Sequence, residues 1–286
     1  MEWWFILGIL SGLFNGLAYT VSKKALSKMS PALASIGFTL FSLPYFVLML
    51  LWSGWAVTDF TFWWSTILAA VVNVGGFLLL MKALKIGNIS QVIPFLSFTP
   101  LFLLVVSNLM LGEFPNSSGL LGVVIIVGGA YIVQLDKEGG FLGPFKSIMK
   151  SKATKLVLAT AFLYSITSTL SKVAILNSNP MTFLIVYQGL AGLILIPLMQ
   201  KSEQKVEEFR SHIKPLALMG LLEALTLICQ MIAVSTGLVS YIVSLKRTSA
   251  IWSVVLGYFI FREKNIKLRL IGASLMIIGI VLISQG

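Results

Sequence analysis

The chain has 286 residues, of which 57% are hydrophobic and only 11% charged. Soluble domains carry charges on about a quarter of their residues, so this composition excludes a soluble fold and indicates an integral membrane protein. The one cysteine, Cys229, excludes an internal disulfide bond, and the net charge of +11 reflects lysines beside apolar segments, which is typical of a cytoplasmic membrane face and not of a nucleic-acid partner.

A membrane-spanning helix needs roughly 20 apolar residues at ~1.5 Å rise per residue. By that rule the sequence predicts an all-α membrane protein with ten transmembrane helices, numbered here as spans 1 to 10. They are Trp3–Val21, Ala32–Trp52, Phe62–Leu84, Ile89–Leu111, Ser117–Gln134, Lys155–Val173, Met181–Met199, Ile213–Ser235, Leu238–Phe261 and Leu268–Ser284.

The second half of the chain repeats the first. Residues recur at an offset of 149 or 150: Ser22-Lys23 as Ser171-Lys172, Pro31 as Pro180, and Glu113 as Glu263. We therefore expect one five-span repeat over residues 1–136, a linker over 137–154 and a second repeat over 155–286. Because five is an odd number, the second repeat must enter the membrane from the opposite side, as in the inverted repeats of secondary transporters.

The basic residues predict the orientation in the membrane. Of the 21 lysines and arginines, 18 lie in the connections that follow spans 1, 3, 5, 7 and 9. The positive-inside rule places these connections in the cytoplasm and both termini outside it, in a multi-pass protein of the inner or plasma membrane. The other three basic residues are Lys172, Lys246 and Arg247.

Glu223 lies near the middle of span 8, in the stretch LALMGLLEALTLICQM. A carboxylate at that depth costs several kcal/mol unless it is paired, neutral or exposed to water, so a functional role is the first hypothesis. Glu223 is expected to bind a cationic group of a substrate or to carry a coupling proton. The alternative is a structural ion pair with Lys246 of the next span. Asn73 occupies the matching position of the first repeat, which suggests one central cavity lined from both halves.

Lys246 and Arg247 lie about nine residues into span 9, where the first repeat has Leu96 and Ser97. Neighbours on a helix point ~100° apart, so both cannot face the same cavity. Lys246 is expected to recognise an anionic group there, or to pair with Glu223 and close a gate. Arg247 is expected to reach away or to find a structural partner.

Other polar and aromatic residues within the spans complete the predicted cavity lining: Gln91, Gln188, Tyr187, Tyr241, Trp252, Asn15 and Tyr19. Each alone is more often a contact between helices. Glu113 and Glu263 are expected to cap or pack at span ends. Gly128, Gly129, Gly272 and Gly279 should let spans 5 and 10 approach closely.

No motif for catalysis is present: there is no Walker loop, GxSxG or HExxH sequence, and we expect no enzyme activity, cofactor or metal. The segments FTPLFLLVVSNLMLGE (Phe98–Glu113) and LKRTSAIWSVVLGYFIFREK (Leu245–Lys264), with the repeated Ser-Lys-x-Ala pattern, resemble the EamA family of the drug/metabolite transporter superfamily. The resemblance covers essentially the whole chain.

The resemblance implies a basket of spans 1–4 and 6–9 around a central cavity, with spans 5 and 10 at the side, and transport without ATP. It does not fix the substrate. Two features depart from many relatives: they carry a basic residue early in spans 2 and 7, where this chain has Phe38 and Gln188, and they place their termini in the cytoplasm.

The residues and the resemblance together predict a secondary active transporter that moves a small metabolite by alternating access. A zwitterion or cation such as an amino acid or amine is preferred, because the cavity offers a carboxylate and an ammonium group. The alternatives are an exporter of drugs or nucleobases, or a membrane protein that does not transport, either an assembly partner or an embedded enzyme. The expected partners are the solute and the lipid bilayer, with proton or ion coupling and a homodimer left open and no nucleic acid.

Overall fold

The computed structural model describes residues 3–26, 29–87, 93–133, 151–200, 212–249, 251–252, 255–256 and 266–284, and in this part of the chain all regular structure is helical. The elements are α1 (Trp3–Leu26), α2 (Pro31–Ser53), α3 (Phe60–Ile86), the 3-10 helix η1 (Ile93–Phe98), α5 (Thr99–Leu111), α6 (Ser117–Val133), α8 (Lys152–Leu176), α9 (Pro180–Gln200), α11 (Ile213–Thr236), α12 (Val239–Lys246) and α14 (Ile266–Ser284).

Six of these helices, namely α1, α2, α3, α8, α9 and α11, are long and apolar enough to cross a membrane. The shorter apolar helices α5, α6 and α14 coincide with other predicted spans. The all-helical membrane fold is therefore confirmed, while the exact number of ten spans stays a prediction.

Helix boundaries follow the capping chemistry of the sequence. The side chains of Ser30, Asp59 and Ser151 accept hydrogen bonds from the first turns of α2, α3 and α8, at 3.2, 2.8 and 3.3 Å. These bonds satisfy N–H groups that have no partner within the helix. Gly112 ends α5 with a φ of 67°, a left-handed conformation that glycine adopts without strain.

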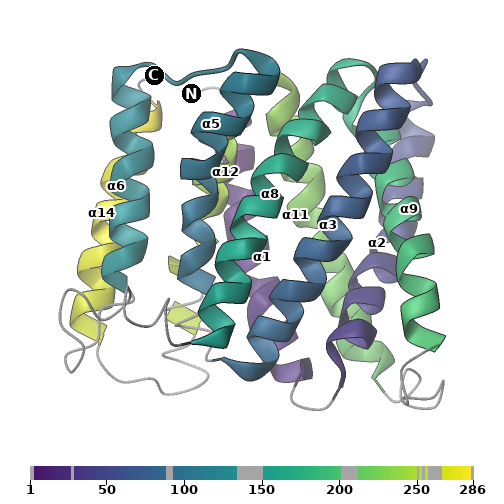
Figure 1. The fold of residues 1–286 in the computed structure, drawn as a ribbon, viewed down its shortest axis with the longest axis horizontal. Coiled ribbons are helices and arrows are strands. Elements are labelled where there is room, and N and C mark those ends of the chain that lie inside the picture. Colours follow the sequence, from purple (N-terminus) through teal and green to yellow (C-terminus); the bar gives the residue numbers. More distant parts are fainter. Residues whose placement is uncertain are drawn as a thin grey trace.

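The helices are arranged with the same symmetry as the sequence repeat (Figure 1). Helix α1 packs along α11, and α8, its counterpart in the second half, packs along α3. Helices α2 and α9 pack together, and α6 and α14 form a separate pair at one side of the bundle. This is the basket with a lateral helix pair that the family resemblance implied.

Glycines set the distance between α6 and α14. A Cβ atom on Gly122 would lie 2.7 Å from the carbonyl oxygen of Gly279, and one on Gly129 would lie 2.5 Å from that of Gly272. The close approach predicted for Gly129, Gly272 and Gly279 therefore occurs, and it joins the two halves of one chain. Gly128 takes no part, because nothing lies within 4 Å of the same position on it.

A second row of glycines brings α1 against the end of α12 and the residues that follow it. Gly8, Gly12 and Gly16 are spaced four residues apart on α1, and they face Leu245, Thr248 and Trp252. A Cβ atom on Gly12 would lie 3.0 Å from the carbonyl oxygen of Leu245. Small residues at this spacing let two backbones come into contact within a membrane.

Span 4 is interrupted, as its prolines Pro94 and Pro100 indicated, whereas span 9 is not the continuous helix that the sequence predicted. In span 4 a 3-10 helix, η1, precedes α5. In span 9 helix α12 ends at Lys246, and the amides of Arg247 and Thr248 each donate to the carbonyl three residues back, at 3.0 Å. The breaks lie near matching positions of the two repeats. Pro100, in the first turn of α5, lacks the N–H group that would have extended the helix backwards.

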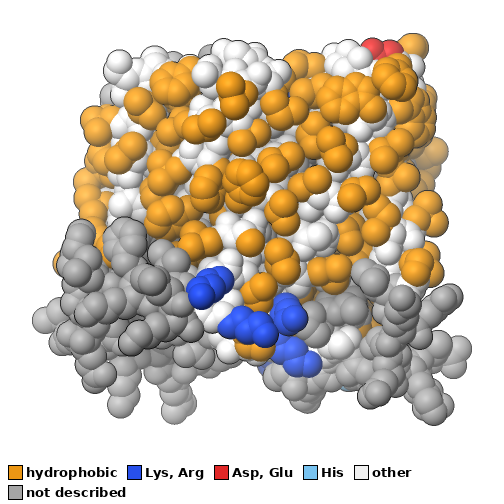
Figure 2. All heavy atoms as spheres, in the orientation of Figure 1, with side chains coloured by type: hydrophobic (Ala, Val, Ile, Leu, Met, Phe, Trp, Pro, Cys, Tyr) orange, Lys and Arg blue, Asp and Glu red, His pale blue; other side chains and the backbone are white. Residues whose placement is uncertain are grey.

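The surface fits a protein embedded in lipid. In Figure 2 hydrophobic side chains cover most of the described height of the molecule, and the lysines and arginines lie at one end. Figure 1, in the same orientation, places both chain termini at the opposite end. This one-sided distribution of basic residues agrees with the pattern along the chain.

Gly129→Ala should destabilise the protein by about 1–3 kcal/mol, because its new methyl group meets the backbone of α14 and overpacks the contact. Gly128→Ala is the matched control: it makes the same change one residue away, in open space, and should keep or raise the stability. The thermal unfolding midpoint of the purified proteins measures both. Equal midpoints for the two variants would contradict this packing.

Candidate functional site

A cavity lies in the middle of the basket and holds about 760 Å³ of empty space, open solvent at its mouth included. Both halves of the chain line it. The polar and charged residues in its wall are Asn15, Tyr19, Thr39 and Asn73 from the first half, and Tyr164, Thr167, Ser168, Ser171, Tyr187, Gln188, Glu223, Gln230, Lys246 and Arg247 from the second.

Most of the residues singled out in the sequence meet at this cavity. Glu223, Lys246, Asn73, Gln188, Tyr187, Asn15 and Tyr19 all line it. Gln91 lies outside the described residues.

Two predicted lining residues, Tyr241 and Trp252, are instead used for packing. The Tyr241 hydroxyl donates to Asn116 Oδ1 over 3.1 Å, and its ring stacks on Trp4 with centroids 6.2 Å apart. Trp252 packs against Gly16 of α1. Tyrosine and tryptophan side chains are amphipathic and can line a cavity, but the sequence could not show which neighbouring helix they would meet.

Lys246 does not form the direct ion pair with Glu223 that the sequence left open. Its Nζ donates to Gln230 Oε1 over 2.6 Å. Gln230 lies seven residues after Glu223, two turns along the same face of α11, and this spacing was readable in the sequence. Among the described residues Glu223 has neither a hydrogen bond nor an ion pair, although its charge and that of Lys246 interact. Its carboxylate is therefore available to a solute in the cavity.

Arg247 lies in the cavity wall beside Lys246, contrary to the prediction that only one of them could face it. Both long side chains reach the cavity wall from the end of α12, although neighbours on a helix point about 100° apart. Arg247 is 3% exposed, and its Nη2 donates to Thr99 Oγ1 over 3.0 Å.

Three residues of one cavity wall, Thr167, Ser168 and Ser171, were missed by the sequence analysis. Tyr164, Thr167, Ser168 and Ser171 all lie on α8. Their spacing of three, one and three residues places them on one helix face, so the signal was present in the sequence. On the opposite wall the Gln188 amide donates to Ser42 Oγ over 3.0 Å, which fixes α9 against α2.

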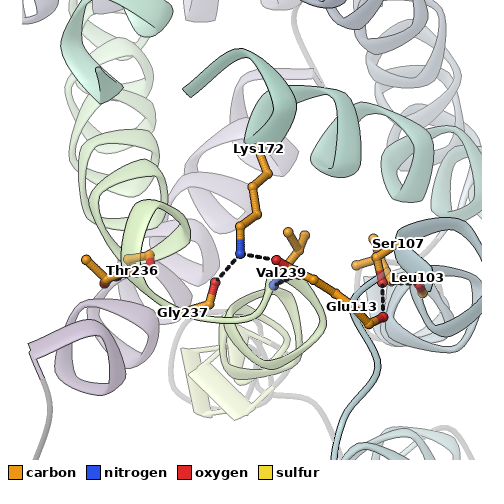
Figure 3. A network of polar contacts seen from close by, with 8 residues as sticks. Leu103, Ser107, Glu113, Lys172, Thr236, Gly237 and Val239 are labelled. Carbon is orange, nitrogen blue, oxygen red and sulfur yellow. Dashed lines mark hydrogen bonds and ion pairs between the residues drawn. The ribbon is translucent and has the colours of Figure 1, made fainter. Parts of the chain in front are cut away.

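An ion pair joins the two halves at the end of the molecule where the termini lie (Figure 3). Lys172 of α8 pairs with Glu113, which follows α5, and its Nζ also donates to the carbonyl of Gly237 over 2.8 Å. Glu113 Oε2 in turn accepts the amide of Val239, at the start of α12, over 3.2 Å. The expected capping role of Glu113 is thus present, but the helix that it caps belongs to the other half.

Lys23, the counterpart of Lys172, repeats part of this arrangement at the other end of the bundle. Its Nζ donates to the carbonyls of Leu84 and Gly87 at the end of α3, over 2.8 and 2.5 Å. Gly87 corresponds to Gly237 at the offset of 150. Glu263, the counterpart of Glu113, lies outside the described residues.

The model of the EamA-like transporter family matches residues 2–135 and 151–285 of this sequence. No curated protein matches this sequence. A crystal structure of another protein is similar over 99% of this chain and 95% of that chain, with a TM-score of 0.70 and 14% sequence identity. At that identity the likeness shows a shared fold and nothing of the substrate.

Glu113→Gln and Lys172→Met should each destabilise the protein by about 3–5 kcal/mol, because each leaves a mostly buried charge unpaired. The double variant should cost clearly less than the sum of the two, since it removes both charges together. Thermal unfolding of the four proteins of this cycle measures the coupling, with the exposed Lys155→Met as a control. Additive effects would show that the pair contributes nothing of its own.

Proposed function

This chain belongs to the EamA-like transporter family, and we propose from that membership that it carries a small metabolite across the membrane by alternating access. The observation that carries the proposal is the central cavity, which brings the carboxylate of Glu223 and the cation of Lys246 together inside an otherwise apolar bundle. Ionisable groups at such depth mark the path of a solute or ion. A catalytic role is not proposed, because the family is one of transporters.

The broken spans support this assignment. In transporters built from inverted repeats, solute and ion sites lie near the membrane midplane where helices are discontinuous. Here Arg247 at the end of α12 binds Thr99 at the start of α5, so the two interrupted spans meet at the cavity wall. We propose the repeats as residues 1–136 and 155–286, rocking about this point.

The preferred solute is a zwitterion or cation such as an amino acid or amine. Glu223 would bind its ammonium group, and Lys246, held by Gln230, would complement a negative group. Alternatively, Glu223 would carry the proton that drives transport. Asn73 and Gln188 add neutral polar groups, and the rings of Tyr19 and Tyr187 supply apolar surface.

Alternating access needs a contact that closes the cavity at one end of the bundle in one state and breaks in the other state. The Lys172–Glu113 pair is placed for this role, because it joins the two repeats at the end of the molecule that carries the termini. The lysines and arginines at the opposite end support an orientation in which that end faces the cytoplasm and both termini lie outside.

The proposal predicts that Glu223→Gln abolishes solute movement without loss of fold. Proteoliposomes containing the full chain are loaded with single amino acids or amines, and counterflow of the same radiolabelled solute is measured. The wild type should accumulate at least one of them, and Glu223→Gln and Lys246→Met should lower its rate at least tenfold, equivalent to about 1.4 kcal/mol of lost binding or coupling. The exposed Lys82→Gln should behave as the wild type.

The same assay separates the two roles of Glu223. Counterflow needs no net proton movement, so a proton-carrying carboxylate would leave counterflow intact in Glu223→Gln and abolish only uptake driven by a pH gradient. A substrate-binding carboxylate would lose both. Unchanged transport in both modes would overturn the role of Glu223, and a wild type that moves none of the solutes would favour a non-transporting assembly partner.

A further inference from the structure

Arg247 is a buried cation whose hydrogen-bonding capacity is mostly unused. A guanidinium group offers five N–H donors, and Thr99 takes only one of them, from Nη2. Among the described residues, Nε and Nη1 have no hydrogen-bond partner, and both atoms are shielded from solvent. Buried donors without acceptors are costly, so this arrangement points to an acceptor that the protein itself does not supply.

Asn15 of α1 shows the same deficit in the same cavity. It is 2% exposed, and its Nδ2 has no partner among the described residues. Tyr19 stands one turn further along α1 and interacts with both Asn15 and Arg247. Two unsatisfied donor groups therefore line one part of the wall, held there by the glycines of α1 that pack against the residues after α12.

The charges of the cavity favour an anionic ligand group. Among the described lining residues the charged ones are Glu223, Lys246 and Arg247. Glu223 and Lys246 interact with each other, which leaves the charge of Arg247 without a counterpart. One uncompensated positive charge inside a membrane is matched best by one negative charge.

We propose that Arg247 and Asn15 form a subsite that binds the carboxylate group of the transported solute. The inference rests on the proposed transport function and names one end of its substrate. With Nη2 holding Thr99 by one hydrogen, one edge of the guanidinium still presents two N–H groups, the second Nη2 hydrogen and its neighbour on Nε or Nη1, and a flat carboxylate matches such an edge. A phosphate monoester is disfavoured because its charge of about −1.5 to −2 exceeds that of one arginine.

The subsite also changes the roles of Lys246 and Glu223 in binding the solute. Lys246 already donates to Gln230, whereas Nε and Nη1 of Arg247, a residue of the cavity wall, have no acceptor among the described residues. The solute's carboxylate then lies against Arg247 and Asn15, and any ammonium group that it carries lies toward Glu223. Because Thr99 and Asn15 belong to the first repeat and Arg247 to the second, the bound carboxylate contacts both moving halves.

The test compares solutes that differ only in their charged groups. For three carbon skeletons, the amino acid, the amine without its carboxylate and the acid without its amine are used: alanine, ethylamine and propionate; valine, isobutylamine and 3-methylbutyrate; phenylalanine, phenethylamine and 3-phenylpropionate. Acetate and methyl phosphate complete the panel. The thermal unfolding midpoint of the purified full chain reports binding, because a ligand of the folded state raises it.

Carboxylates should raise the midpoint of the wild type, and Arg247→Gln and Asn15→Leu should each weaken that response at least tenfold in ligand concentration. Arg247→Lys should restore it only in part, since it keeps the charge and loses the planar fork. Lys82→Gln serves as the control.

If Arg247→Gln does not fold, a second variant that is not expected to lose stability still tests the proposal. Asn15→Asp places a carboxylate of the protein itself beside Arg247. It should raise the midpoint of the ligand-free protein and abolish the response to acetate and the other acids.

The proposal is overturned if no carboxylate shifts the wild type, if the shift survives in Arg247→Gln or Asn15→Asp, or if methyl phosphate binds more tightly than acetate. Failure of this kind is distinct from failure of the transport function. If amines still bind in a Glu223-dependent way and counterflow is intact, transport stands and only the carboxylate subsite falls.

Discussion

The absence of water inside a bilayer governs how this protein is built. An ionised group placed there is costly unless it has a partner, and several of the described groups find one within the protein. Lys172 pairs with a carboxylate and donates a hydrogen bond to a backbone carbonyl, and Lys23 donates to two backbone carbonyls at the end of α3. Lys246 donates a hydrogen bond to the side-chain amide oxygen of Gln230. Glu223 and most of the Arg247 guanidinium have no hydrogen bond from the described protein, and both line the cavity. The residues left incomplete are thus two that line the central cavity.

Much of this site could be predicted from the sequence, because charge inside an apolar segment is conspicuous. Glu223, Lys246 and, through the repeat, Asn73 were identified in that way, and the close contact of α6 and α14 followed from glycine spacing. Arg247 was misjudged because the direction of the backbone does not show how far a long, flexible side chain reaches. The Lys172–Glu113 pair was missed because its partners lie on different repeats, and contacts between distant segments leave no local signal. Tyr241 was misplaced for a related reason: periodicity gives a helix face but not the neighbour that covers it.

The two repeats share a backbone plan and differ in chemistry. Span 4 and span 9 are interrupted near the same register, yet the first carries Leu96 and Ser97 where the second carries Lys246 and Arg247. The glycine row of α1 allows the backbone after α12 to come close, and so holds Arg247 near Asn15 and Tyr19. The shared plan interrupts both spans, and only the second repeat places charged residues at the interruption. A substitution in the glycine row would thus alter binding without touching a solute.

The Lys172–Glu113 pair has a consequence for how tightly a solute binds from each side of the membrane. If the proposed alternating access opens the bundle at that end, it separates two mostly buried charges, and a cost of about 3 kcal/mol leaves that open form at roughly 1% of molecules. A solute that arrives from this side binds only to that fraction, so its apparent affinity is about 100-fold weaker than the intrinsic one. The same cavity would then bind its solute more strongly from one side than from the other, and a single ion pair distant from the cavity would set the ratio.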